Sequence, residues 1–499
     1  MPITNTNIKT RQDPPPGDSR SAHTASVNVK NNKESNELKF KLNKVDKTLD
    51  LAGMCLNLKI INLRIGLFMV LFFLLINSFV LNRSALITYK ILIDNSIMSM
   101  SRIEDMTGML ETSSIQYYVY NNESLSLPHI RAKATEDAPM TWTGKWGRRF
   151  AHYGLGEIRW LESLEGHPLR TMDPSEAVFF VVPIPVTAAM FWGSTNEKNE
   201  KELGNAFEAI LNGALFQKYP ERHVVAISTS EKAFGWSFWG LSNKEMKQFD
   251  GAMVVRDSDR DRVDKWKHEN NLTYCIENDK AGKIFTKVVA LGFGGEGSNS
   301  HYAYQAATLE NWNKKKFWFF YHTRESASSC SSTAIRHAFF FNSTKPTLLE
   351  HQPVSIGMGL PYEEWKQTYE NSKFCLVLRG DNPGSRALLR SVRNGCIPLI
   401  VSDPLPFYQP LYERTLQYDD FALIIREDDF LMDPIGSLDT AVSSLSPANI
   451  MHKLEGLRLL QRIIAVDQPG SLFVQAFSRE IVEAMKENGV ATEKVGAFL

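Results

Sequence analysis

A short turn between a strand-like run and a helical run holds the residues of this chain best suited to bind a charged ligand. Residues 374–378 are apolar and read as a strand, residues 379–384 as a tight turn, and residues 385–393 have helical spacing. The turn places free backbone N–H groups at the helix N-terminus, with Arg386 in the first helical turn. Such N–H groups and a guanidinium group together form a receptacle for a diphosphate.

The neighbouring elements position this turn. Asn394 and Gly395 end the predicted helix, because both tolerate the left-handed conformation of a C-cap. Residues 396–401 then form a second apolar strand. A strand, a glycine turn, a helix and a second strand of these lengths predict one right-handed βαβ unit of a parallel sheet.

Strand and helix patterns alternate along most of the chain, in two successive sets. Strands are predicted at residues 116–120, 177–182, 224–228, 252–255 and 287–291 in the first set, and at 317–321, 374–378, 397–401 and 422–425 in the second. Helices are predicted at residues 197–215, 449–466 and 471–486. This alternation predicts two doubly wound α/β domains.

The same residues resemble a known family. Residues 374–376, Gly380-Asp381, Pro383, Ser385-Arg386 and 395–403 are similar to the signature of exostosin-type glycosyltransferases. The similarity continues at residues 405–407 and 427–429, a weaker block lies at 171–183, and the whole resemblance extends over residues 114–470. It implies the GT-B architecture, in which two Rossmann-like domains face each other across a cleft. It also implies inverting transfer of a sugar from a nucleotide-sugar donor, which we expect to be UDP-linked, to a glycan acceptor.

This resemblance gives the candidate residues their roles. We expect Arg386 to neutralise the leaving diphosphate, assisted by Ser385 and by the turn that contains Gly380, Asp381 and Gly384. The alternative for Arg386 is a surface arginine that caps a tight turn. GT-B enzymes commonly stabilise the diphosphate with a helix N-terminus and basic side chains, so no metal or other cofactor is expected.

Further acidic and basic residues follow predicted strands. Arg324 comes after residues 317–321 and is a second candidate for the phosphates. Asp403 follows the strand at 397–401, where it orients the loop over the diphosphate or only caps it. Glu427 follows the strand at 422–425 and is a candidate acceptor of hydrogen bonds from ribose or sugar hydroxyls, although Asp428 and Asp429 are equally well placed. No catalytic base can be selected among His152, His223, Asp257, Asp259 and His301.

Residues 292–297 spell G-x-G-x-x-G after the strand predicted at 287–291, which is the dinucleotide-binding fingerprint. The next strand, however, ends in His322-Thr323-Arg324 and lacks the acid that would hold an NAD ribose. An NADP-dependent oxidoreductase is therefore a secondary alternative, and a pliable loop bordering the cleft is the preferred interpretation. The first alternative to an active transferase is instead a catalytically silent GT-B protein that binds glycan or supports a partner transferase.

The chain has 499 residues and a formal net charge of zero, which gives no indication of a nucleic-acid partner.

Residues 1–59 are polar and predict a disordered cytoplasmic tail. Residues 60–88 contain the only long apolar run and predict a transmembrane signal anchor, because lysines and arginines are denser before it than after it. A buried core helix and a cleaved signal are the alternatives. The predicted divisions that follow are a stem at 89–113, an acceptor domain at 114–312, a nucleotide-sugar domain at 313–470, and a C-terminal helix and tail at 471–499.

This topology predicts a single-pass type II membrane protein with a lumenal catalytic domain, and the resemblance to exostosin-type enzymes implies the Golgi membrane. Asn122, Asn271 and Asn342 begin glycosylation sequons, which agrees with a lumenal position. Four lumenal cysteines, at positions 275, 330, 375 and 396, permit three disulfide pairings. Cys375 and Cys396 start neighbouring predicted strands and are either buried thiols or a bridge. No cysteine or histidine pattern indicates a structural metal, and the sequence does not distinguish a monomer from a homo- or hetero-oligomer.

Overall fold

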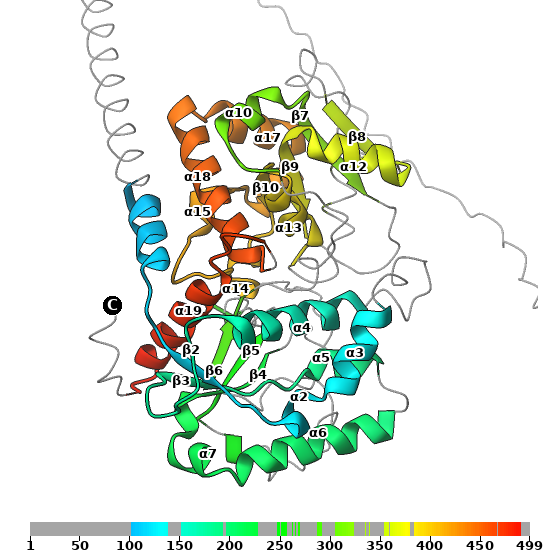
Figure 1. The fold of residues 1–499 in the computed structure, drawn as a ribbon. Helices are drawn as coiled ribbons and strands as arrows, with labels where there is room; N and C mark the ends of the chain where they lie inside the picture. Colours follow the sequence, from blue (N-terminus) through cyan, green and yellow to red (C-terminus); the bar gives the residue numbers. More distant parts are fainter. Residues whose placement is uncertain are drawn as a thin grey trace, which may run out of the picture. The chain divides into compact units, whose positions relative to one another are not determined.

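The computed structural model describes the chain in segments, and the two sheets that they form are both entirely parallel (Figure 1). The described residues are 101–137, 151–192, 196–227, 247–249, 251–256, 262, 265, 268–269, 287–291, 305–323, 335, 339, 354–358, 360–379, 384–466 and 468–490. Parallel pairing in both halves agrees with two Rossmann-like domains.

The first sheet contains the five strands predicted in this half and one short addition. Its order is β2-β1-β3-β4-β5-β6. The strands are β1 (Tyr117–Val119), β2 (Arg170–Thr171), β3 (Phe179–Val181), β4 (His223–Ile227), β5 (Met253–Arg256) and β6 (Lys287–Ala290). Phe179 to Val181 and His223 to Ile227 are buried along their whole length, as strands covered on both faces must be.

The chain segments between and around these strands form helices. They are α2 (Glu123–Ser126), α3 (Pro128–Asp137), α4 (Ala151–Gly166), α5 (Val186–Trp192), α6 (Asn196–Leu211) and α7 (Ala214–Lys218), with short 3-10 turns η3 (Pro220–Arg222) and η6 (Lys247–Phe249). The helix predicted at residues 197–215 is two helices in the structure, α6 and α7. Gly213, between them, has an extended backbone and is the N-cap residue of α7. The predicted stripe holds, since Leu203, Phe207 and Ile210 are buried.

The second sheet has the order β11-β10-β9-β7-β8. Its strands are β7 (Phe317–Thr323), β8 (Val354–Met358), β9 (Ser372–Leu378), β10 (Ile397–Val401) and β11 (Leu423–Ile424). All four strands predicted here are present, and β8 is an edge strand that the sequence pattern does not reveal. The predicted βαβ unit is confirmed as β9, α13 (Arg386–Arg393) and β10, with Gly395 at a φ of 55° after the helix.

The remaining helices lie in the C-terminal half of the sequence. They are α10 (Leu309–Lys314), α12 (Tyr362–Glu370), α14 (Leu405–Tyr408), α15 (Tyr418–Phe421), α16 (Glu427–Met432), α17 (Pro434–Ser443), α18 (Pro447–Ile464) and α19 (Phe473–Glu487). The helix α19 packs against the first half of the chain, where the ring of Phe477 lies 6.3 Å from that of Phe179 and the ring of Phe473 lies 5.4 Å from that of Trp160. Residues 101–111, within the predicted stem, are helical, and Ile103 and Leu110 are buried.

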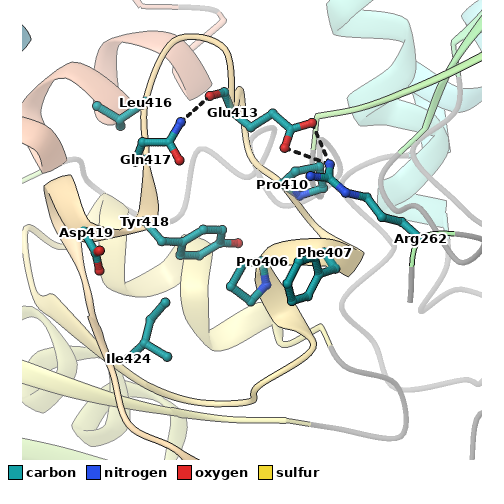
Figure 2. Close-up of a pocket in the computed structure, with 10 residues that line it drawn as sticks. All are labelled: Arg262, Pro406, Phe407, Pro410, Glu413, Leu416, Gln417, Tyr418, Asp419 and Ile424. Carbon is teal, nitrogen blue, oxygen red and sulfur yellow. Dashed lines mark hydrogen bonds and ion pairs between the residues drawn. The ribbon is translucent and has the colours of Figure 1, made fainter. Parts of the chain in front are cut away.

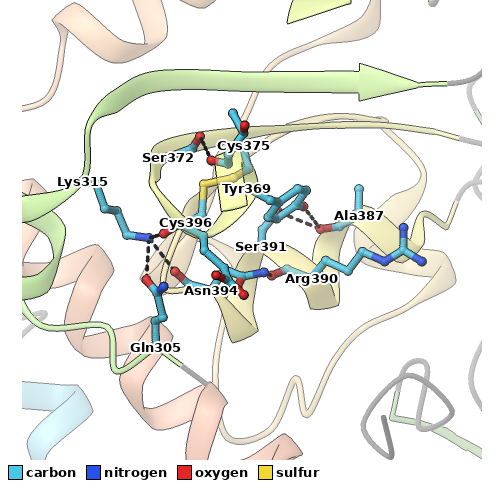
Figure 3. Close-up of a disulfide and its surroundings, with 12 residues drawn as sticks. Gln305, Lys315, Tyr369, Ser372, Cys375, Ala387, Arg390, Ser391, Asn394 and Cys396 are labelled. Carbon is cyan, nitrogen blue, oxygen red and sulfur yellow. Dashed lines mark hydrogen bonds between the residues drawn. A yellow bond between two sulfur atoms is a disulfide. The ribbon is translucent and has the colours of Figure 1, made fainter. Parts of the chain in front are cut away.

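A disulfide between Cys375 and Cys396 joins β9 to the residue that precedes β10 (Figure 3). The two cysteines are 21 residues apart, and their Cα atoms are separated by 5.9 Å. Closing a loop of this length contributes about 3 kcal/mol to the free energy of unfolding in the chain-entropy model. The structure thus selects the bridge over the two buried thiols, while Cys275 and Cys330 lie outside the described residues.

A buried lysine holds the ends of two helices beside this disulfide (Figure 3). Lys315 Nζ donates hydrogen bonds to the carbonyl oxygen of Glu370, the last residue of α12, at 2.6 Å and to that of Asn394, the residue after α13, at 2.7 Å. Burial lowers the pKa of Lys315 to about 8. These contacts fix the C-terminal end of α13, so the direction of its N-terminus is set by the core.

No helix among the described segments from residue 101 onward has the length and apolar character needed to cross a membrane. The anchor predicted at residues 60–88, the disordered tail predicted at 1–59 and residues 292–297 all lie outside these segments.

Candidate functional site

The strand order of the second sheet marks one place where a ligand site is expected. From β7 the chain moves to β8 on one side and then returns past β7 to β9 on the other. In open α/β sheets ligands bind beyond the carboxyl ends of the strands at such a reversal of direction. The segments that follow β7 and β9 lead to Arg324 and to the start of α13, which are the two phosphate sites predicted from the sequence.

The N-terminus of α13 is built as predicted. Ser385 is its N-cap residue, with an extended backbone, and the Ser385 hydroxyl accepts a hydrogen bond from the Ala387 N–H at 3.3 Å. Arg386 is the first helical residue, but its side chain lies outside the described part of the structure. Gly380, Asp381 and Arg324 lie entirely outside the described residues, so the contacts predicted between them and the donor remain predictions.

Three charged residues from adjacent strand ends meet at the carboxyl edge of the second sheet. Arg379 follows β9, Asp403 lies two residues beyond β10, and Glu427 begins α16 after β11. Arg379 Nη2 lies 3.0 Å from Glu427 Oε2, and both side chains are at least nine-tenths buried. Glu427 Oε1 accepts a hydrogen bond from the Asp403 N–H at 3.2 Å, and Asp403 Oδ1 accepts one from the Glu427 N–H at 3.1 Å.

This cluster refines the roles predicted for the two acids. Asp403 caps the start of α16, and burial raises the pKa of its carboxyl group above the ordinary value. Each carboxylate oxygen of Glu427 has a protein partner, so the side chain clamps the ends of three strands together. A carboxylate has about four lone-pair positions, and an additional bond from a sugar hydroxyl to Glu427 stays a prediction. Sequence reasoning missed Arg379, although its place directly after an apolar strand is a signal that it shares an edge with Asp403 and Glu427.

A pocket of about 280 Å³ lies beside the segment that connects β10 to β11 (Figure 2). Arg262 Nη1 bonds both carboxylate oxygens of Glu413 at 2.7 Å at one end of this pocket. The lining combines apolar surfaces of proline, aromatic and aliphatic side chains with polar groups, and is formed by Arg262, Pro406, Phe407, Pro410, Glu413, Leu416, Gln417, Tyr418, Asp419 and Ile424. The carboxylate of Glu413 is therefore already paired with the guanidinium group of Arg262.

Among the candidate bases, only the environment of His223 can be described. It is fully buried at the first position of β4 and contacts the Tyr120 hydroxyl at 2.8 Å and the Tyr219 carbonyl oxygen at 2.7 Å. Burial lowers the pKa of His223 to about 4. Because His223 lies at the amino end of a parallel strand and inside the core, its position indicates a packing role and not a catalytic one. His152 lies on α4, but its side chain is outside the described part of the structure. Asp257, Asp259 and His301 lie outside the described residues altogether.

Of the three predicted glycosylation sites, Asn122 is described. It is exposed and caps α2, where its side-chain oxygen accepts a hydrogen bond from the Ser124 N–H at 2.9 Å. Asn271 and Asn342 lie outside the described residues. Within the described segments, no group of three or more histidine, cysteine, aspartate or glutamate side chains could hold a metal ion.

Comparison with known proteins agrees with the sequence resemblance. The model of the exostosin GT47 domain matches residues 118–438, which is well over half of the chain. An exostosin-1 homolog of Caenorhabditis elegans is 36% identical over 77 residues, which cover 15% of this chain and 19% of the relative. A probable glycosyltransferase of Arabidopsis thaliana is 24% identical over 135 residues, which cover 26% of this chain and 24% of the relative. The chain thus matches about a quarter or less of the length of these relatives.

Proposed function

The chain belongs to the exostosin GT47 family, and we propose that it transfers a sugar from a UDP-linked donor to a glycan acceptor with inversion at the anomeric carbon. Family membership indicates a glycosyltransferase. The observation that carries the finer proposal is the N-terminus of α13, which follows β9 where the strand order of the second sheet reverses. A diphosphate is the ligand that this place in an open α/β sheet suits best.

The proposed reaction needs one displacement. The acceptor hydroxyl oxygen attacks the anomeric carbon, the bond from that carbon to the phosphate oxygen breaks, UDP leaves, and a base takes the hydroxyl proton. Arg386, the Ser385 backbone and the positive end of the α13 dipole would stabilise the negative charge that develops on the diphosphate. Because these groups supply positive charge, we propose that no metal ion is required.

The first test is a donor screen with the purified full-length chain. We expect UDP release from one of a panel of UDP-sugars to rise when an oligosaccharide acceptor is added, and most of this activity to survive EDTA. The configuration of the new bond, read by NMR, should be opposite to that of the donor. Release of no nucleotide from any UDP- or GDP-sugar would leave the silent GT-B alternative in place, and complete loss of activity in EDTA would refute metal independence.

We further propose that the described part of the chain faces the lumen of the Golgi and that residues 60–88, which precede it in the sequence, are its membrane anchor. The Cys375–Cys396 disulfide supports an oxidising compartment, since such bonds are rare in the cytosol. The exposed side chain of Asn122 supports access for a glycosyltransferase that modifies sequons.

Enzymatic removal of N-glycans tests this orientation. Protein from its native host is expected to migrate faster on a denaturing gel after digestion, and substitution of Asn122 by glutamine should reduce the shift by one glycan. The same digestion of protein made in bacteria, which attach no such glycans, serves as the control. Identical migration before and after digestion of the native-host protein would argue against a lumenal domain.

A further inference from the structure

Gln409, which follows α14, has a buried side chain whose amide donor is unsatisfied within the described part of the structure. The residue is 1% exposed, and Nε2 has no hydrogen-bond partner among the described residues. A buried donor left unsatisfied destabilises a protein by about 1–3 kcal/mol. Such groups are uncommon in folded proteins, and one explanation for them is a ligand that completes the bonding.

The carboxamide of Gln409 lies at the entrance of α13. A Cβ atom added at Gly384 would lie 2.9 Å from Cδ and Oε1 of Gln409 and 3.0 Å from Nε2. A side chain at position 384 would therefore displace the carboxamide from its present place. Gly384 directly precedes Ser385, the N-cap residue of α13, so an unsatisfied donor and a helix N-terminus share one location.

The backbone at Gln409 is held by two hydrogen bonds, and its buried side chain lies against Gly384. The Gln409 N–H donates to the Leu405 carbonyl oxygen at 2.8 Å, closing the last turn of α14. The Tyr418 hydroxyl, from the wall of the pocket in Figure 2, donates to the Gln409 carbonyl oxygen at 2.6 Å. A group positioned in this way binds a ligand without a large loss of conformational entropy.

We propose that Gln409 Nε2 donates a hydrogen bond to an oxygen of the donor diphosphate at the N-terminus of α13. This inference rests on the proposed function and names one more residue that binds the same substrate. An N–H donor next to a helix N-terminus matches an anion, because the helix dipole and the amide both attract negative charge. Gln461 is also a buried glutamine, but both the donor and the acceptor of its carboxamide form hydrogen bonds within the protein.

Gln461 provides the matched control. Its Nε2 donates to the carbonyl oxygens of Gln305 and Val392, each at 2.7 Å, and its Oε1 accepts from the Ala307 N–H at 3.0 Å. Replacement of Gln461 by methionine should lower the melting temperature, since three groups lose a partner, and should leave UDP affinity within about twofold. Replacement of Gln409 by methionine should keep or raise the melting temperature, because an unsatisfied donor is removed.

The test compares binding of UDP and uridine by calorimetry in the full-length protein and its variants. A hydrogen bond to a charged group corresponds to about ten- to a hundredfold in affinity. We therefore expect Gln409→Met to weaken UDP binding by that factor and to leave uridine binding unchanged. Gln409→Glu should weaken UDP binding more, because its carboxylate repels the diphosphate, and Gly384→Ala should resemble Gln409→Met because it displaces the carboxamide.

The outcomes separate this inference from the proposed function. If the unmodified protein binds UDP and releases it from a UDP-sugar, but Gln409→Met binds UDP equally well, the inference is wrong and the proposed function stands. Equal losses of UDP and uridine affinity in Gln409→Met would also overturn the inference, because they would show a contact with the nucleoside. If the unmodified protein binds no UDP, both the inference and the proposed UDP-linked donor fall.

Discussion

Replacing Arg386 by alanine is expected to lower the rate of sugar transfer by about 10²–10³-fold, which is the loss typical when one preorganised donor to a developing negative charge is removed. Arg386 is the first residue of α13, where we propose that its guanidinium group and the helix N-terminus act on the same leaving diphosphate. The loss should appear mainly in kcat, because charge on the bridging oxygen grows as its bond to the sugar breaks. Steady-state kinetics with the donor from the screen would measure it.

Arg390 lies on the same helix one turn later and serves as the control. Its guanidinium carbon lies 5.3 Å from the centre of the Trp365 ring, so the side chain packs against α12. Arg390→Ala should therefore retain nearly full activity, and both variants should unfold close to the temperature of the unmodified protein. A kcat for Arg386→Ala within about threefold of that of Arg390→Ala would exclude the proposed role of Arg386.

The strands of the second sheet could be predicted where they are covered on both faces. Residues 374–378 and 397–401 form unbroken apolar runs, and in the structure these strands are buried and pair with each other in parallel. The edge strand β8 escaped prediction, since Val354–Met358 includes serine and glycine and pairs only with β7. The helix predicted at 197–215 was too long because a hydrophobic stripe shows periodicity but does not show where a glycine interrupts the helix.

The candidate site was predictable to the extent that it depends on local order along the chain. The start of α13 follows from a strand, a turn with glycines and an N-capping serine, all within about fifteen residues of sequence. Gln409 could not be found in this way. Its significance comes from contact with Gly384, and from the absence of a partner for Nε2 among the described residues, and both depend on how distant segments pack.

The buried pair formed by Arg379 and Glu427 should give the largest effect on stability. Replacing either residue alone leaves a buried charge without its partner, and the cost is about 3–5 kcal/mol of unfolding free energy. We expect Arg379→Met and Glu427→Gln each to show a loss of this size in chemical denaturation. The double variant should lose much less than the sum of the two, because no buried charge remains while the glutamine oxygen can still accept from the Asp403 N–H.

The pair formed by Glu310 and Lys314 on α10 gives the comparison, since both side chains are more than two-thirds exposed. Glu310→Gln should leave the unfolding free energy nearly unchanged, because solvent screens such pairs. Strictly additive losses for Arg379→Met and Glu427→Gln would show that the two charges do not depend on each other. If the singles are destabilised as expected, the ends of β9, β10 and β11 are held as one unit, and this rigid edge supports the loops that we propose to bind the donor.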